Sequence, residues 1–170
     1  ISESKKRRVL ALKKTKNIDV SCESLTTHDV ANSINNITGQ SACKWLVMEW
    51  DGRESSGIFI GNPIGWLLRN VNSSLALFKD NGVRSFSKVL IAVRPGRRNK
   101  RFIDVADKIC RHFGASLTLL NIVSESDNNQ KIKRTEKSSI ELISETKSKS
   151  AVKIIKSNHP VEAISEESAS

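Results

Sequence analysis

A group of arginines is the part of the sequence best suited to bind a charged ligand. Arg94, Arg97 and Arg98 follow closely after the apolar run at residues 89–93. In open α/β sheets, ligands bind beyond the carboxyl ends of parallel strands, so these guanidinium groups predict a site for an anion such as a phosphorylated ligand. The alternative is a solvated basic start to the next helix, although cations at a helix N-terminus oppose its dipole.

The sequence lacks the residue patterns of catalytic and metal sites. It has no nucleophile elbow and no paired carboxylates in an apolar context. The three histidines have no metal-ligand spacing. The odd set Cys22, Cys43 and Cys110 contains no CxxC pair, which favours reduced core residues over disulfides. We therefore expect a protein that is not an enzyme and holds no metal.

Three tryptophans have two interpretations. Trp45, Trp50 and Trp66 could stack on an adenine ring, or they could pack in the core or at an interface, as buried aromatic side chains commonly do.

The first half of the chain predicts helices and strands in alternation. Thr27 is a suitable N-cap, Gly39 a helix stop and Pro63 a first helical residue. The predicted elements are helices over 3–16, 28–38 and 63–71 and strands over 18–23, 44–48 (buried) and 74–78. The apolar residues expected to face inward are Val30, Ala31, Ile34 and Ile37 in the second helix and Ile64, Leu67, Leu68 and Val71 in the third.

The second half follows the same alternation more clearly. The continuous apolar run over 88–93 predicts a central parallel strand covered on both faces, and Gly114 predicts a helix end. The other predicted elements are a helix over 98–113, a strand over 116–123, a polar helix over 128–149, a strand over 151–156 and a helix from Pro160. The expected inward residues of the 98–113 helix are Phe102, Val105, Ala106, Ile109, Cys110 and Phe113; those of the polar helix are Ile132, Ile140 and Ile143.

This alternation predicts an α/β fold with a parallel, doubly wound, Rossmann-like sheet. The two halves either combine in one sheet or form separate half-domains, because the connection over 79–87 is short.

One part of the sequence resembles the universal stress protein family. Residues 88–96, the helix that follows and the segment Gly-Ala-Ser-Leu-Thr-Leu-Leu from Gly114 are similar to the opening of that domain, and residues 27–78 are similar to its closing half. The resemblance implies a fold like that of the adenine-nucleotide α-hydrolases. It also implies the C-terminal half of one repeat at 1–80, a linker at 81–87 and the start of a second repeat at 88–170.

Family members that bind ATP carry a glycine-rich phosphate loop. Gly52 and Gly61 match two of its glycines, and Asn62 takes the place of its hydroxyl residue. Glu49 stands where another glycine belongs, and Pro63 removes an amide donor at the helix start. The family's aspartate after the first strand is replaced by arginine at position 94. The resemblance thus implies a degenerate nucleotide loop, and we expect weak or no ATP binding and no cofactor.

A second resemblance concerns the setting of the domain. The segment at 61–70, with Val83, Arg84 and Lys88 after it, is similar to tandem stress-protein domains fused behind amino-acid-permease-type transporters. This implies a regulatory or ligand-sensing module in the cytosolic part of a transporter. The alternative is a free-standing tandem stress protein that acts as a dimerisation module. We expect the chain to be a piece of a longer protein, because it begins without Met.

The reduced cysteines favour a cytoplasmic location, and the basic clusters form either a solvated face or a surface that attracts an acidic partner or an anionic membrane. The net charge is +10, no apolar run approaches the length of a membrane span, and the first residues do not form a signal peptide. The basic clusters have almost no aromatic residues among them, so we expect no nucleic-acid binding, although it stays a third option.

The strand over 74–78 predicts self-association. Leu75, Leu77 and Phe78 are apolar and no proline blocks the strand. An open edge of this kind pairs readily with a second copy, so we expect a homodimer or aggregation of the isolated chain, with the edge covered in the intact protein.

Overall fold

The computed structural model describes residues 3–49, 63–79, 81–94 and 99–169. Contacts divide the chain into two compact units, unit 1 (residues 1–81) and unit 2 (residues 82–170). None of the described helices is both long and apolar enough to cross a bilayer.

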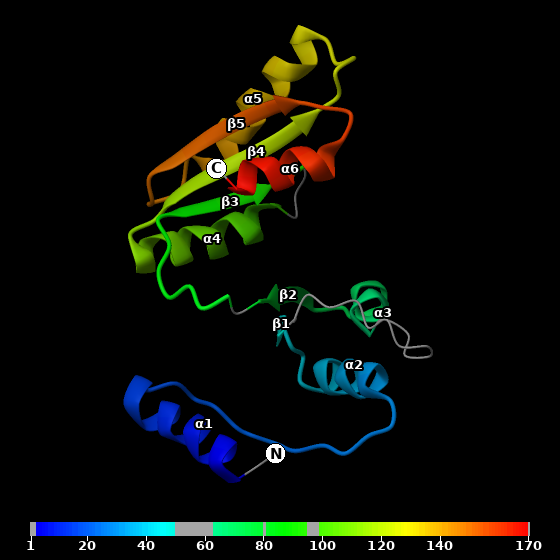
Figure 1. Ribbon diagram of the computed structural model, residues 1–170, viewed down its shortest axis with the longest axis vertical. Helices are drawn as coiled ribbons and strands as arrows, with labels where there is room; N and C mark the ends of the chain where they lie inside the picture. The colour runs from blue at the N-terminus through cyan, green and yellow to red at the C-terminus, as the bar shows by residue number, and fades with distance from the viewer. Residues whose placement is uncertain (1–2, 50–62, 80, 95–98, 170) are drawn as a thin grey trace. The chain divides into compact units, whose positions relative to one another are not determined.

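Unit 1 contains three helices and a parallel pair of strands (Figure 1). Its elements are α1 (Glu3–Lys16), α2 (Val30–Gln40), β1 (Trp45–Glu49), α3 (Pro63–Asn70) and β2 (Ser74–Phe78). In the two-stranded sheet, Trp45 lies opposite Ser74 and Glu49 opposite Phe78.

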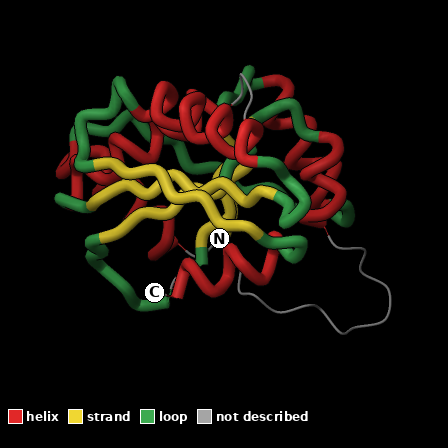
Figure 2. Tube along the Cα trace, turned by 90° about the horizontal axis from the view of Figure 1, so that it is seen from above, coloured by secondary structure: helices red, strands yellow, loops and turns green. Residues whose placement is uncertain are grey.

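Unit 2 contains a three-stranded parallel sheet in the order β3-β4-β5 (Figure 1). Its elements are β3 (Lys88–Ala92), α4 (Asn99–Phe113), β4 (Ser116–Val123), α5 (Asn129–Ile143), β5 (Ser150–Lys156) and α6 (Pro160–Ala169). Helices α4 and α5 cover one face of this sheet, and α6 lies on the other face, close to the chain end marked C in Figure 2. The α/β class with parallel strands and helices on both faces is thus confirmed.

The core of unit 2 lies between its sheet and α4. Ile103, Ala106 and Cys110 of α4 pack against Leu117 and Leu119 of β4 and are almost fully buried. Side chains alternate along a strand, so Leu120, which is also fully buried, belongs to the face that α6 covers.

The side chain of Asp107 links α4 to the segment between α5 and β5 through hydrogen bonds. Its Oδ1 accepts hydrogen bonds from the backbone N–H groups of Lys147 (2.9 Å) and Ser148 (2.8 Å), and its Oδ2 accepts one from Arg111 Nε (3.0 Å). Burial alone would raise the pKa of the carboxyl group, but these donors, Ser148 first, lower it below its ordinary value. Asp107 is therefore a charged structural tie inside unit 2.

The strand predictions need three corrections. Residues 18–23 form no strand and belong to neither sheet of the described residues. The strand predicted over 44–48 exists as β1, but it is not buried: Val47 is 66% exposed. Residues 88–92 form an edge of the three-stranded sheet, whose central strand is β4, so β3 is only half-buried. The two halves form two sheets in the described residues and not one.

Three helix ends also differ from the predictions. The cap of α2 is Asp29, not Thr27, because the Asp29 carboxylate accepts a hydrogen bond from Asn32 N at 3.0 Å. Gly39 does not stop this helix, which continues to Gln40, and the left-handed conformation falls on Ala42. Helix α5 ends at Ile143, six residues before the predicted end at position 149. Gly114 ends α4 with φ +68°, as predicted.

The predicted helix faces are partly wrong. The buried residues of α4 are Ile103, Ala106, Asp107 and Cys110. Of the six residues predicted to face inward, only Ala106 and Cys110 are buried, and Phe102, Ile109 and Phe113 stay partly exposed. Leu68 in α3 is 63% exposed, whereas its neighbour Leu67 is fully buried. Val30, Ile37 and Ile140 were also predicted to face inward but are exposed.

All three cysteines are free, and only Cys110 is buried.

Candidate ligand site

A cavity lies at the carboxyl edge of the sheet in unit 2. Its volume is about 540 Å³. Each of the three strands contributes residues at or just beyond its end: Val93 and Arg94 after β3, Ser124 after β4, and Ser157 and Asn158 after β5. This is the position at which open parallel sheets bind their ligands.

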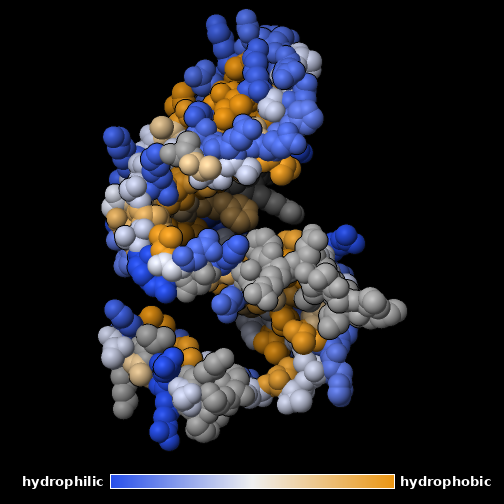
Figure 3. Space-filling model, viewed as in Figure 1, coloured by the Kyte–Doolittle hydropathy of each residue, from blue (hydrophilic) through white to orange (hydrophobic). Residues whose placement is uncertain are grey.

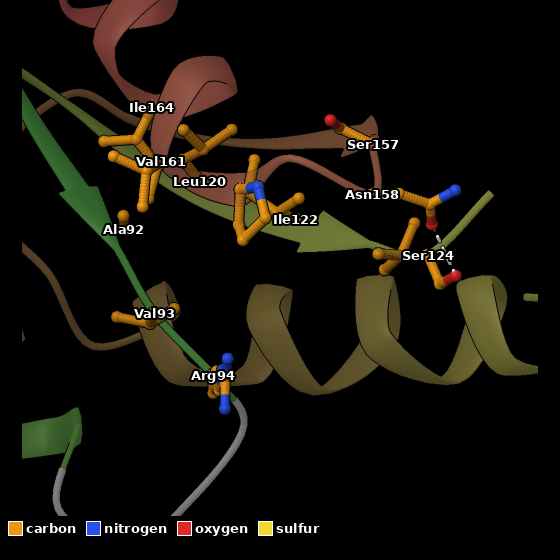
Figure 4. A pocket seen from close by; sticks show the side chains of 12 residues that line it. Ala92, Val93, Arg94, Leu120, Ile122, Ser124, Ser157, Asn158, Val161 and Ile164 are labelled. Atoms are coloured by element: carbon orange, nitrogen blue, oxygen red, sulfur yellow. Dashed lines mark hydrogen bonds between the residues drawn. The ribbon is translucent and has the colours of Figure 1, made fainter.

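The inner part of the cavity is apolar. Figure 4 shows Leu120 and Ile122 of β4 on one side and Val161 and Ile164 of α6 on the other, with Ala92 beside them. These side chains belong to the sheet face that α6 covers. They form a surface against which a hydrocarbon or aromatic group can be buried.

The other end of the cavity is polar, and its groups are held in place by Asn158. Asn158 Oδ1 accepts hydrogen bonds from Ser124 Oγ (2.9 Å) and from the backbone N–H of Glu125 (3.3 Å), and its Nδ2 donates to Glu125 Oε2 (3.1 Å). The dashed line in Figure 4 marks the bond to Ser124. Asn158 therefore joins the end of β4 to the segment that leads into α6 and fixes one wall of the cavity.

The turn after β4 is fixed by a carboxylate. Asp127 Oδ2 accepts a hydrogen bond from Ser124 N at 3.1 Å, and its Oδ1 pairs with Lys131 Nζ at 2.6 Å. Lys131 lowers the pKa of Asp127, with the N–H of Ser124 adding to the effect. The carboxylate thus stays charged at neutral pH and keeps Ser124 at the mouth of the cavity.

The first turn of α6 also borders the cavity. The Ser157 hydroxyl accepts a hydrogen bond from His159 N at 2.9 Å, and Pro160 is the first helical residue. Pro160 and Val161 line the cavity together with Ser157. The N-terminus of α6 therefore borders the cavity, although Pro160 supplies no N–H donor there and Glu162 adds a negative charge to the first turn.

The structure brings only part of the predicted anion site together. Arg94 lines the cavity and is exposed, as the position after β3 requires. Arg97 and Arg98 lie outside the described residues, as do Gly52, Gly61 and Asn62 of the predicted nucleotide loop. Trp45 and Trp66 lie in unit 1 and do not line this cavity, and Trp50 is outside the described residues.

Sequence reasoning missed most of the residues in this site. Ser124 and Ser157 directly follow strands that were predicted with the correct ends, at positions 123 and 156. Because the carboxyl ends of adjacent parallel strands meet at one edge, all three loops could have been grouped with Arg94. The apolar wall from α6 had no comparable signal, since Val161 and Ile164 stand in a short helix with few apolar residues.

The lining provides contacts for a ligand: aliphatic side chains, two hydroxyls, an amide and a guanidinium. Among the described residues, no group of three His, Cys, Asp or Glu side chains could hold a metal ion. No protein-family model and no curated protein matches this chain.

Proposed function

We propose that the chain is a non-catalytic, ligand-sensing module of the universal-stress-protein type, and that its ligand binds at the carboxyl edge of unit 2. The observation that supports this most is the cavity formed by the ends of all three parallel strands and α6. Its volume of about 540 Å³ lies within the range of small-molecule sites, which are mostly apolar with a few convergent polar groups.

The two ends of the cavity define the kind of ligand. An apolar body fits against Leu120, Ile122 and Val161, and an anionic head fits near Arg94. A nucleotide triphosphate fits less well, because the resemblance places an aspartate where Arg94 stands and the loop with Gly52 and Gly61 departs from the ATP-binding pattern.

Calorimetric titration of the whole chain tests this function. Octyl phosphate carries both an apolar body and an anionic head, and we expect it to bind with a Kd below about 1 mM, whereas inorganic phosphate alone gives no measurable heat. Magnesium-ATP should bind more weakly than octyl phosphate. Absence of octyl phosphate binding, or ATP binding with a micromolar Kd, would contradict the proposal.

A pair of variants locates the site. Ala92→Phe places a large side chain in the cavity and should weaken octyl phosphate binding at least tenfold, whereas Ala151→Phe, on an exposed position of β5, should leave it unchanged. Equal affinities for the two variants would place the ligand elsewhere.

We further propose that this module is cytoplasmic and belongs to a transporter of the amino-acid-permease type. The support is the resemblance of residues 61–70 to tandem stress-protein domains fused to such transporters. The amino-acid sequence encoded upstream of Ile1 tests this directly: about ten apolar helices there would support it, and a short soluble leader would favour the free-standing form.

A second function, dimerisation through β2, has its own support. Leu77 is 41% and Phe78 is 56% exposed, and in the described residues β2 pairs only with β1. Exposed apolar side chains on a strand with one open edge favour pairing with a second copy of the chain.

A further inference from the structure

Helix α1 carries most of the net charge of the protein. Its 14 residues include seven basic residues and one acidic residue, Glu3, which gives a formal charge of +6 against +10 for the whole chain. The basic residues stand in two blocks on either side of the apolar turn 9–12: Lys5, Lys6, Arg7 and Arg8 before it, and Lys13, Lys14 and Lys16 after it.

This helix is open to an outside partner. Arg7, Arg8 and Lys16 are exposed, and Leu10 is 50% exposed. In the described part of the chain, α1 has no more than marginal packing against any other helix or strand. Figure 3 shows hydrophilic (blue) side chains beside apolar (orange) ones on α1, the helix at the lower left of Figure 1.

A helix of this composition gains little stability from water alone. Isolated helices of about 12–15 residues are marginal, and like charges three or four residues apart repel each other. A surface of negative charge removes that repulsion, so the charge pattern of α1 suits an anionic partner better than it suits free solution.

The apolar turn decides which anionic partner fits. A bilayer offers negative headgroups to Arg7 and, beneath them, a hydrocarbon region for Leu10, which lies three residues on and on the same side of the helix. Arg8 and Lys16 lie on other sides and add to the attraction through their charge. A nucleic acid offers phosphates but no place for an aliphatic side chain, and α1 has no aromatic residue to stack on bases. We propose that α1 docks the protein on the surface of an anionic lipid bilayer, lying along it without crossing it.

Co-sedimentation of the whole chain with lipid vesicles tests the proposal. At about 0.1 M salt the protein should bind vesicles with about 30% phosphatidylserine, should not bind pure phosphatidylcholine, and should be released near 0.5 M salt. Equal binding to both vesicle types, or binding to neither, would overturn it.

Matched variants assign the binding to α1. Arg7→Gln with Arg8→Gln should weaken vesicle binding roughly thirtyfold, since each basic residue near the surface contributes about a fivefold effect. Lys133→Gln with Arg134→Gln removes the same charge from exposed positions of α5 and should have little effect. Leu10→Gln should weaken binding several-fold with no change in charge, which separates lipid insertion from simple ion attraction.

Duplex DNA in place of vesicles provides the opposing outcome. If the protein binds DNA more tightly than anionic vesicles, and Leu10→Gln does not change its affinity for DNA, then the partner of α1 is a nucleic acid and not a membrane. The octyl phosphate titration should be unaffected by all α1 variants, so failure of the membrane proposal is distinguishable from failure of the ligand site.

Discussion

Units 1 and 2 both have parallel strands, but only β4, the central strand of unit 2, is largely buried. Of the buried apolar residues in the described part of the chain, Leu67 alone belongs to unit 1, and the other nine belong to unit 2. The strands of unit 2 have α4 and α5 on one face and α6 on the other, whereas β1 has Val47 66% exposed. An apolar strand is buried only when helices cover both faces of its sheet, so composition alone does not define a core.

The same difference explains why the candidate site lies in unit 2. A cavity with fixed walls requires neighbouring strand ends at a defined register and a helix across them. In unit 2 the ladder continues beyond the strands, with Val93 N bonded to Leu120 O and Ser157 N bonded to Val123 O, both at 2.9 Å. These bonds hold the three loops of the cavity in one place.

The largest expected effect is on the core of unit 2. Leu119→Ala removes a fully buried side chain from the central strand and should lower the free energy of unfolding by about 3 kcal/mol. Leu68→Ala, the same change at a 63% exposed position of unit 1, should cost less than about 0.5 kcal/mol. Urea denaturation followed by circular dichroism measures both free-energy changes. Equal changes would contradict the conclusion that unit 2 holds the larger buried core.

A second test concerns the hydrogen bonds that Asp107 accepts inside unit 2. Asp107→Ala leaves the N–H groups of Lys147 and Ser148 without their acceptor and should destabilise the protein by about 2 kcal/mol. Asp104→Ala removes the same charge from an exposed position of the same helix and is the matched control. If both variants have the same stability, Asp107 does not hold α4 in place.

The contribution of Asp107 also has a defined pH dependence. Its pKa is lowered in the folded protein, so the unfolded state binds the proton more readily. The stabilisation is fully present above the unfolded pKa of about 4 and disappears as the pH falls through the lower folded value. The stability difference between wild type and Asp107→Ala should therefore be constant from pH 5 to 7 and shrink below pH 4, in urea titrations repeated across that range.

A smaller effect is expected at the strand edge of unit 1. Leu77→Lys places a charge on β2 and should raise the dissociation constant of the expected homodimer at least tenfold, as measured by light scattering over a dilution series. Leu68→Lys, at another exposed leucine of unit 1, controls for the added charge. A wild-type chain that stays monomeric at high concentration would show that this edge is covered within the chain.

Apart from the strand predicted over 18–23, the order of helices and strands was predictable from the sequence, because periodicity and turn residues act locally. Pro160 and Gly114 fixed element ends correctly for that reason. Which strand is central was not predictable from composition: residues 89–93 and 116–123 are both apolar, and only pairing in the folded sheet places β4 in the middle.

The candidate site was predictable to the extent that it follows strand ends. Arg94 was placed at the carboxyl edge from its position after an apolar run. Asn158 was missed because its role depends on hydrogen bonds to Ser124 and Glu125, more than thirty residues away in the sequence. Contacts at such separations arise from the fold and leave no local pattern.

Mapping of the bound ligand by NMR is the most direct test of the proposal that unit 2 senses a small molecule. Amide chemical shifts of the whole chain would be recorded while octyl phosphate is added. The largest changes should fall on residues that line the cavity, among them Ala92, Arg94, Ser124 and Val161, and should saturate with one Kd. Changes centred on unit 1, or small unsaturable changes spread over the basic surface, would contradict a ligand site at the carboxyl edge of this sheet.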